Sequence, residues 1–228
     1  IGPDAATIRL QPGVIGGVAN RRLAPFARKI GPDPASIDAA MIGGIAANNA
    51  SGMCCGTAQN SYRTLAAMRV VLVDGAVLDT ADPASVAAFR ASHADLLSSL
   101  GALAHETKGN TVLADRIRHK FRIKNTTGYS LNALVDYDDP VDILIHLLIG
   151  SEGTLGFISD ITYHTVAEHP CKASALVVFN DLESACKVVT LLSAAPVAAV
   201  ELMDRAALRS VEQKPGMPEN IGALGPDG

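Results

Sequence analysis

The residues best suited to chemistry lie between Ile30 and Gly56, in the stretch IGPDPASIDAAMIGGIAANNASGMCCG. Gly43, Gly44 and Gly52 leave almost no side-chain bulk in it, and glycine permits the positive-φ turns that aim successive N–H groups at one point. Amides oriented in this way bind anions, above all the phosphates of nucleotide cofactors. A tight loop between a helix and a strand is the alternative for a single glycine pair. Side-chain donors and acceptors beside these glycines come from Asn48, Asn49 and Ser51.

A second glycine-rich segment, GSEGTLGFI, runs from Gly150 to Ile158, and KNTTGY precedes it at Lys124–Tyr129. Together, IGPDP-x7-IGGIAANNASG, KNTTGYSL and IGSEGTLGFI resemble the FAD-linked oxidases of the vanillyl-alcohol-oxidase type. Within that family they look most like the D-2-hydroxyacid dehydrogenases, the D-lactate and D-2-hydroxyglutarate enzymes, in a long bacterial form that also carries an iron–sulfur segment. The resemblance extends from about Arg9 to Ser210 and depends on three motifs in the family's order.

The resemblance implies an α+β architecture in two parts. Residues 1–168 correspond to the second subdomain of a PCMH-type FAD-binding domain, and residues 169–228 to the first half of a ferredoxin-like cap domain. Both ends look cut, because the chain has no initiating methionine and its last residues, IGALGPDG, form no closing element. We therefore expect an internal fragment of a longer polypeptide, inactive by itself.

The family's FAD-binding residues can be transferred only to positions that match its motifs. A family tyrosine before the last glycine of the first motif is Cys55 here, and the alternative for Glu152 is a surface carboxylate at a helix end. The motifs imply that FAD is bound by Pro34, Ile42, Gly43, Gly44, Asn48, Asn49, Ser51, Gly52, Gly56, Glu152, Gly153 and Ile158.

For the parent protein, the resemblance implies oxidation of a D-2-hydroxy acid to the 2-oxo acid by hydride transfer to the flavin. No catalytic residue and no metal ligand is assigned within these positions. An iron–sulfur cluster and a divalent metal belong, if present, to parts of the parent protein outside this chain, and its electron acceptor stays unassigned.

Two other hypotheses remain open. The same fold serves flavin oxidases of lactones, sugars and aromatic alcohols and an alkyl-transferring enzyme, although ELMD at Glu201–Asp204 resembles the hydroxyacid branch. No histidine lies between Ile1 and Ser92, so we do not expect covalent attachment of flavin in this part. The third hypothesis is a non-catalytic fragment that cannot hold FAD alone, because half a site buries too little of a ligand.

Composition excludes several classes of protein. Apolar residues make up 48% and aromatic residues only 4%, so aliphatic side chains must form the core. A net charge of −4 argues against a nucleic-acid partner, and the basic run RIRHKFRIK at Arg116–Lys124 indicates a solvated face or an anion contact. No apolar run approaches the roughly 20 residues of a membrane span, and no signal peptide is visible. These features predict a cytoplasmic protein.

The four cysteines show no CxxC spacing, which predicts small buried or half-buried thiols without a metal or a disulfide. We expect His93, His105 and His119 to be surface or half-buried residues, and His146, within an apolar run, to be a hydrogen-bonded core residue.

Periodicity and turn signals predict the following elements. They are a strand over 7–11, a helix over 14–29 with Pro25 near its end, a short helix over 39–47 capped by Ser36 or Asp38, a hairpin of 67–73 and 76–80 around Asp74–Gly75, helices within 83–121, a helix over 141–149, a strand over 157–166, and a β-α-β-α run over 172–179, 181–193, 197–203 and 204–211.

Overall fold

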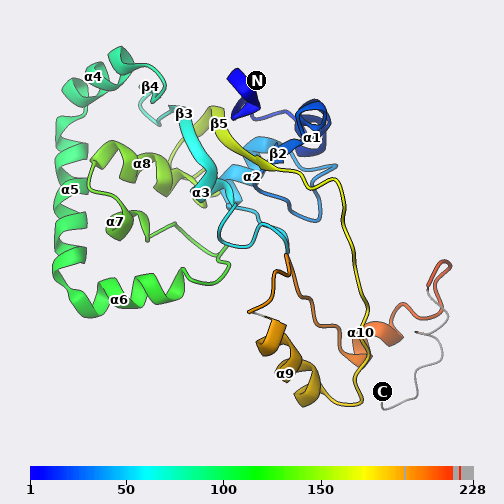
Figure 1. Cartoon of the computed structure of the whole chain (residues 1–228). Coiled ribbons are helices and arrows are strands. Elements are labelled where there is room, and N and C mark those ends of the chain that lie inside the picture. Colours follow the sequence, from blue (N-terminus) through cyan, green and yellow to red (C-terminus); the bar gives the residue numbers. More distant parts are fainter. Residues whose placement is uncertain (193, 218–220, 222–228) are drawn as a thin grey trace. The chain divides into compact units, whose positions relative to one another are not determined.

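The structure is a computed structural model that describes residues 1–192, 194–217 and 221. The chain divides into two compact units, Ile1–Pro170 and Cys171–Gly228, and each is described by itself (Figure 1). The first unit holds a five-stranded sheet, and the described part of the second unit holds two helices and no strand.

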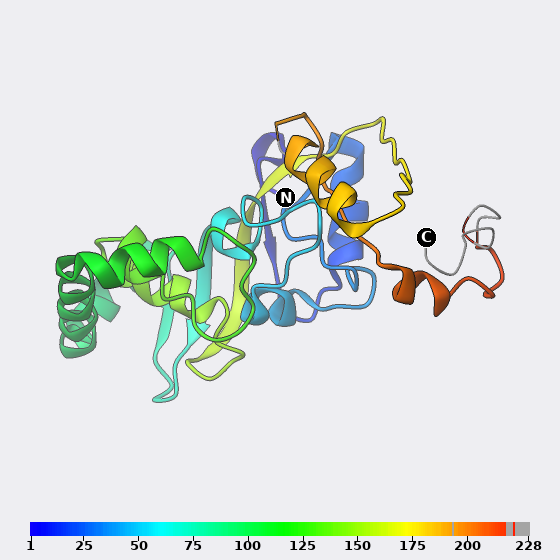
Figure 2. The ribbon, with the colours of Figure 1, turned by 90° about the horizontal axis from the view of Figure 1, so that it is seen from below.

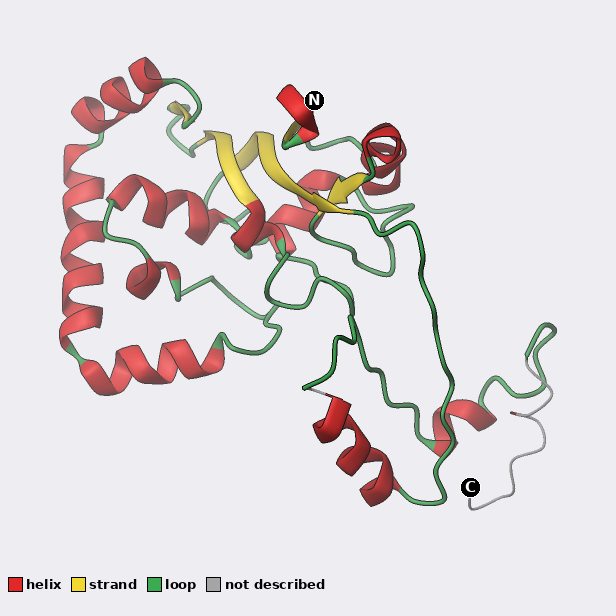
Figure 3. Cartoon of the chain, viewed as in Figure 1, coloured by secondary structure: helices red, strands yellow, loops and turns green. Residues whose placement is uncertain are grey.

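The sheet of the first unit is antiparallel throughout and is built around one long strand, β5 (Phe157–Ala167). Along the sheet the order is β1-β5-β3-β4, and β2 pairs with the C-terminal end of β5. Figure 3 shows β5 and β3 as the long strands of the molecule. The remaining strands are β1 (Thr7–Leu10), β2 (Arg28–Ile30), β3 (Leu65–Val71) and β4 (Val77–Asp79).

A bulge in β5 sets which of its side chains enter the core. Arg69 pairs with Asp160, but the next residue, Val70, pairs with Ile158, so Ser159 is the extra residue of β5. The insertion shifts the two-residue alternation of side chains, and Ile158 and Ile161 are both buried although they are three positions apart. Ser159 Oγ donates a hydrogen bond to the Arg69 carbonyl at 3.2 Å.

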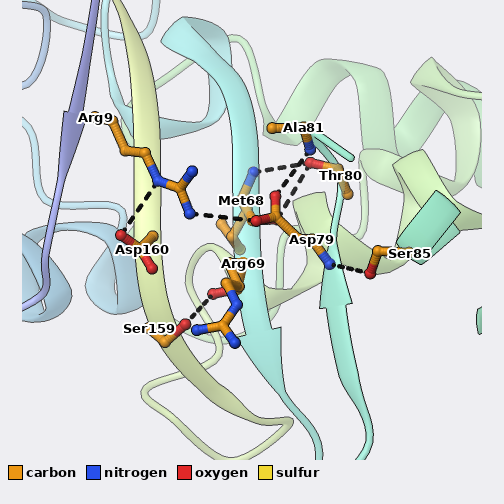
Figure 4. Close-up of polar contacts among 9 residues, drawn as sticks. All are labelled: Arg9, Met68, Arg69, Asp79, Thr80, Ala81, Ser85, Ser159 and Asp160. Carbon is orange, nitrogen blue, oxygen red and sulfur yellow. Dashed lines mark hydrogen bonds and ion pairs between the residues drawn. The ribbon is translucent and has the colours of Figure 1, made fainter. Parts of the chain in front are cut away.

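Charged side chains cross the solvent face of the sheet (Figure 4). Arg9 of β1 reaches Asp160 of β5 at 3.3 Å and Asp79 of β4 at 3.2 Å, and these two carboxylates raise the pKa of the Arg9 guanidinium. Arg9 is half exposed, so these pairs contribute little to the free energy of unfolding. They nevertheless link β1 to β5 and to β4, the two strands that flank β3.

Helices gather beyond the β3–β4 side of the sheet, where α5 runs between α4 and α6, with α7 and α8 packed against it (Figures 1 and 2). α1 lies at the opposite side, against β2. The helices of this unit are η1 (Pro3–Ala5), α1 (Gly16–Leu23), η2 (Ala24–Phe26), α2 (Ile42–Asn48), α3 (Ser61–Thr64), α4 (Pro83–Ser92), α5 (Ala94–Gly109), α6 (Thr111–Lys120), α7 (Ala133–Asp136) and α8 (Pro140–Leu148).

Side-chain caps explain where three of these helices begin. Asp82 accepts a hydrogen bond from Ala84 N at 2.9 Å before α4, and Asp139 accepts one from Val141 N at 2.8 Å before α8. In both cases proline occupies the first turn, where its missing N–H costs nothing. Asn110 caps α6 through Leu113 N at 3.1 Å.

Several sequence predictions are confirmed. The hairpin around Asp74–Gly75 is β3–β4, with Gly75 at φ +86°, and strands form over 7–10 and 157–167. The region 83–121 is helical, and α8 contains His146, whose Nδ1 lies 2.7 Å from the Asp142 carbonyl in the core. Burial lowers the pKa of His146, which keeps the ring neutral.

Two helix predictions were wrong in extent. The helix expected over 14–29 is α1 alone, because η2 contains Pro25 and Ala27 takes a left-handed φ of +51°, after which the chain enters β2. The helix expected over 39–47 begins only at Ile42, and its N-cap is Met41, without a side-chain hydrogen bond. Neither Ser36 nor Asp38 caps it.

The second unit contains α9 (Leu182–Leu192) and α10 (Arg205–Arg209), which confirms both predicted helices. The segments 172–179 and 197–203 are not strands, so this part of the β-α-β-α prediction was wrong. Their valine residues favour a strand. A strand is stable only when neighbouring strands pair with its backbone, and two segments alone are too few for a stable sheet. Within the described part of this unit, the ferredoxin-like order is present only in its helices.

We expect Ile161→Ala to lower the free energy of unfolding of the first unit by about 2–5 kcal/mol. Ile161 is 1% exposed and faces Leu10 on one neighbouring strand and Met68 on the other, so its removal leaves a cavity at the centre of the sheet. Urea unfolding followed by circular dichroism measures this change. Val73→Ala in the fully exposed hairpin turn is the control, and equal losses in the two variants would contradict the central role of β5.

Candidate functional site

The structure brings the two glycine-rich segments together at the C-terminal end of α2. Gly150 N donates to the Ala46 carbonyl at 3.3 Å, and Glu152 N donates to the Ala47 carbonyl at 2.9 Å. Glu152 N thereby satisfies a carbonyl group at the helix end, and Gly150 N adds a second donor to the Ala46 carbonyl, which also accepts from Asn49 N at 3.0 Å. Asn48 Nδ2 then donates to Glu152 Oε1 at 2.5 Å, which joins two predicted site residues directly.

A small cleft of about 100 Å³ lies between the two segments. We call it the glycine cleft. Three of the predicted residues line it, namely Gly43, Gly153 and Ile158. Ser151 also lines it, and its hydroxyl donates a hydrogen bond to the Leu148 carbonyl at 2.8 Å. Its lining residues are Pro12, Gly43, Ala47, Ser151, Gly153, Gly156, Phe157 and Ile158.

Two glycines of α2 serve different purposes. A Cβ at Gly43 would lie 2.7 Å from Pro12 Cβ, so glycine is required there for the chain to approach itself. A Cβ at Gly44 would have no heavy atom within 4 Å, so Gly44 faces open space. Ile42 N and Gly43 N already donate to the carbonyls of Val14 and Pro12, at 2.8 and 2.9 Å. These two amides are therefore not available to an anion.

A second group of predicted residues surrounds Asp33 rather than the glycine cleft. Asp33 Oδ1 accepts hydrogen bonds from Gly52 N at 3.0 Å and from Cys55 N at 3.2 Å. A Cβ at Gly52 would overlap the Asp33 carbonyl, so this glycine lets the two loops meet. Pro34 and Ser51 are buried beside this contact, and Gly56 has a φ of +49° and open space around it.

Two residues of the predicted set have positive φ without being glycine. Asn49 ends α2 in the left-handed conformation at φ +52°, which asparagine adopts more readily than most residues, and its Oδ1 accepts from Tyr62 N at 3.3 Å. Glu152 has φ +54° in the turn that contacts α2. Both positions are explained by the turns that hold the segments together.

Sequence reasoning missed a second, larger cavity of about 350 Å³ in the same unit. We call it the arginine pocket. The only sequence signal for it was the basic run at 116–124, which supplies part of its wall. Its lining residues are Asn49, Thr57, Asn60, Tyr62, Arg63, Arg118, Phe121, Arg122, Ile123, Asn125, Asn132 and Asp136.

Residues 1–81 match the family model described as FAD binding domain, and residues 168–226 match the model of the C-terminal domain of FAD linked oxidases. The first match includes α2 and the Asp33 loop. Both models describe parts of FAD-linked oxidases, and the chain is similar to that family in these two regions.

Two curated relatives are D-2-hydroxyglutarate dehydrogenases. The chain is 25% identical over 215 residues to the one from Haemophilus influenzae and 27% identical over 220 residues to the one from Escherichia coli. Each alignment includes 90% of this chain but only 20% of the relative, so the chain spans about a fifth of their length. Among solved structures, alkyldihydroxyacetonephosphate synthase aligns with a TM-score of 0.40 at 17% identity, over 73% of this chain and 20% of that one.

The residues that the structure describes offer no metal centre, since no three histidine, cysteine or acidic side chains gather there. Likewise, none of the helices described here combines the length and the apolar character that crossing a membrane requires.

The cysteine prediction was wrong for three of the four thiols. Cys54, Cys171 and Cys186 are exposed, and only Cys55 is buried, beside Asp33. Burial, followed by the hydrogen bond with Asp33, raises the pKa of Cys55 to about 11.

We expect iodoacetamide at pH 8 to label Cys54, Cys171 and Cys186 well before Cys55. With a pKa of about 11, roughly one Cys55 in a thousand is a thiolate at this pH, and the thiolate is the reactive form. Peptide mass spectrometry over a time course measures each rate, and neighbouring Cys54 serves as the internal control. Equal rates at the two adjacent cysteines would contradict the buried position of Cys55.

The Asn48–Glu152 contact can be measured with a double-mutant cycle. We expect Asn48→Ala and Glu152→Ala to show a coupling free energy of about 1 kcal/mol, because a hydrogen bond to a charged but exposed group is worth no more. Urea unfolding of the two single variants and the double variant gives the value. A cycle of Asn48→Ala with Glu106→Ala, on the distant helix α5, should be additive. Additivity in both cycles would refute the link.

Proposed function

We propose that the protein carrying this chain oxidises a D-2-hydroxy acid, D-2-hydroxyglutarate or D-lactate, to the 2-oxo acid with FAD as the electron acceptor. The observation that carries the proposal is that the FAD-binding family match contains α2, whose Gly43 lines the glycine cleft together with Gly153 of the second glycine-rich segment. The curated D-2-hydroxyglutarate dehydrogenases favour the hydroxyacid branch of the family.

The glycine cleft fits part of FAD. Apolar atoms of Pro12, Ala47, Phe157 and Ile158 line it, and glycines keep it open, so a flat ring such as adenine can enter between the two segments. Its volume of about 100 Å³ is well below the roughly 300 Å³ of the smaller ligand sites. It therefore holds one part of the cofactor, with the open space at Gly44 beside it.

In this proposal the chain binds and orients the cofactor. Gly43, Gly153 and Ile158 provide the apolar contact surface, while the Asn48–Glu152 contact fixes the distance between the two walls. The amides of Gly52 and Cys55 keep the Asp33 loop closed and do not contact phosphate. When bound, FAD accepts the two electrons that leave C2 of the hydroxy acid as a hydride.

We expect Gly44→Val to abolish FAD uptake in the whole protein, because its branched side chain would fill the open space that Gly44 leaves on α2 beside the glycine cleft. The readout is the ratio of flavin absorbance, at about 450 nm, to protein concentration after desalting. Gly109→Val at the end of α5 is the matched control, since a Cβ there also meets no atom within 4 Å.

Normal flavin content in Gly44→Val would remove α2 from the cofactor site. If the wild-type whole protein takes up no FAD, the proposed function fails. If it binds FAD but neither D-2-hydroxyglutarate nor D-lactate bleaches the flavin band, the cofactor assignment stands and the hydroxy acid is refuted.

A further inference from the structure

A dense run of positive charge covers α6 and the turn that follows it. We call four exposed side chains of this region the basic face, namely Arg116, Lys120, Arg122 and Lys124. None of the four has an ion-pair partner among residues 1–192, 194–217 and 221. The acidic residue of α6, Asp115, pairs instead with Arg118 at 2.9 Å. The basic face therefore holds four uncompensated charges, in a chain whose net charge is −4.

The packing of α6 keeps these charges in solvent. The buried residues of the helix are Ala114 and Ile117, three positions apart, which lie on one side of it. Its neighbours in the first unit are α5 and α7, and it lies at the outer edge of this group of helices (Figure 1). Arg116 and Lys120, four positions apart, share a different side. That side is therefore open to a partner.

Exposed aliphatic side chains lie at both ends of the basic face. Val112, in the first turn of α6, is 80% exposed, and Ile123, between Arg122 and Lys124, is 66% exposed. Protein interfaces combine arginine, in which they are enriched, with a large share of apolar area. The region thus has the composition of a protein-binding surface whose partner must carry negative charge.

We infer that the basic face docks an acidic segment of another protein, with carboxylates along α6 and apolar contacts on Val112 and Ile123. The inference goes beyond the proposed function and does not depend on it. An anionic membrane fits less well, because Ala114 and Ile117 are buried in the unit and leave α6 no continuous apolar side to enter lipid. A nucleic acid also fits less well, because the net charge of −4 repels a polyphosphate.

A charge-removing variant of the whole protein tests this docking. The probe is a fluorescein-labelled peptide of Glu-Glu-Leu repeats, and its binding is followed by fluorescence anisotropy at low salt. We expect Arg116→Gln with Lys120→Gln to weaken binding about tenfold, because two attractive charges are lost. The matched control is Arg21→Gln with Arg22→Gln, which removes the same charge from exposed positions on α1 and should bind like the wild type. A peptide of Gln-Gln-Leu repeats should not bind.

Several results would overturn the inference. One is absence of peptide binding by the wild type, and another is equal binding by the wild type and the α6 variant. Equal weakening by the α1 variant would show that only total charge matters. Phosphatidylglycerol vesicles or duplex DNA that bind the wild type more tightly than the peptide would assign the face to lipid or to nucleic acid. Self-association that the α6 variant abolishes, measured by light scattering, would assign it to a second copy of the chain.

Circular dichroism checks that the α6 variant is folded. If it is not, Arg122→Gln with Lys124→Gln, on the turn after the helix, replaces it, and the same loss of peptide binding is expected. Unchanged binding by this second variant would refute the docking surface.

Discussion

The carbonyl groups at the end of α2 are the constraint on which this part of the molecule depends. The last carbonyls of a short helix lack intrahelical donors, and here Glu152 N bonds to Ala47 while Gly150 N joins Asn49 N at Ala46. The donors come from a turn about a hundred residues later, directly before β5. Satisfying one helix end therefore joins the glycine-rich segments, determines where β5 starts, and creates the glycine cleft between them.

Most glycines considered in this region allow two segments of the backbone to approach each other closely. Gly43 and Gly52 are required because a Cβ would collide with Pro12 or with the Asp33 carbonyl. Gly44 alone, of these three, faces open space. A glycine-rich motif thus specifies a loop architecture first, and the cofactor meets only those glycines that the architecture leaves uncovered.

Local signals made much of the fold predictable. Asp74–Gly75 predicted the hairpin, and Pro140 with apolar periodicity predicted α8, because both depend on residues adjacent in sequence. The bulge at Ser159 and the Asp33–Gly52 contact could not be predicted, since each is set by a partner far along the chain. For the same reason, the strands expected in the second unit have no register without neighbours. The arginine pocket escaped prediction because its wall combines four separate segments.

The adjacent residues Asn48 and Asn49 connect the two cavities. Asn48 turns toward Glu152 at the glycine cleft, whereas Asn49, in the left-handed conformation, lines the arginine pocket and accepts from Tyr62 N. The left-handed conformation of Asn49 thus points the two neighbouring amide side chains in different directions, one to Glu152 and the other to Tyr62 N. The cleft is lined mainly by apolar atoms, while charged side chains line the pocket. Because Ala47 lines the cleft and Asn49 lines the pocket, the two cavities share the end of α2 as one support.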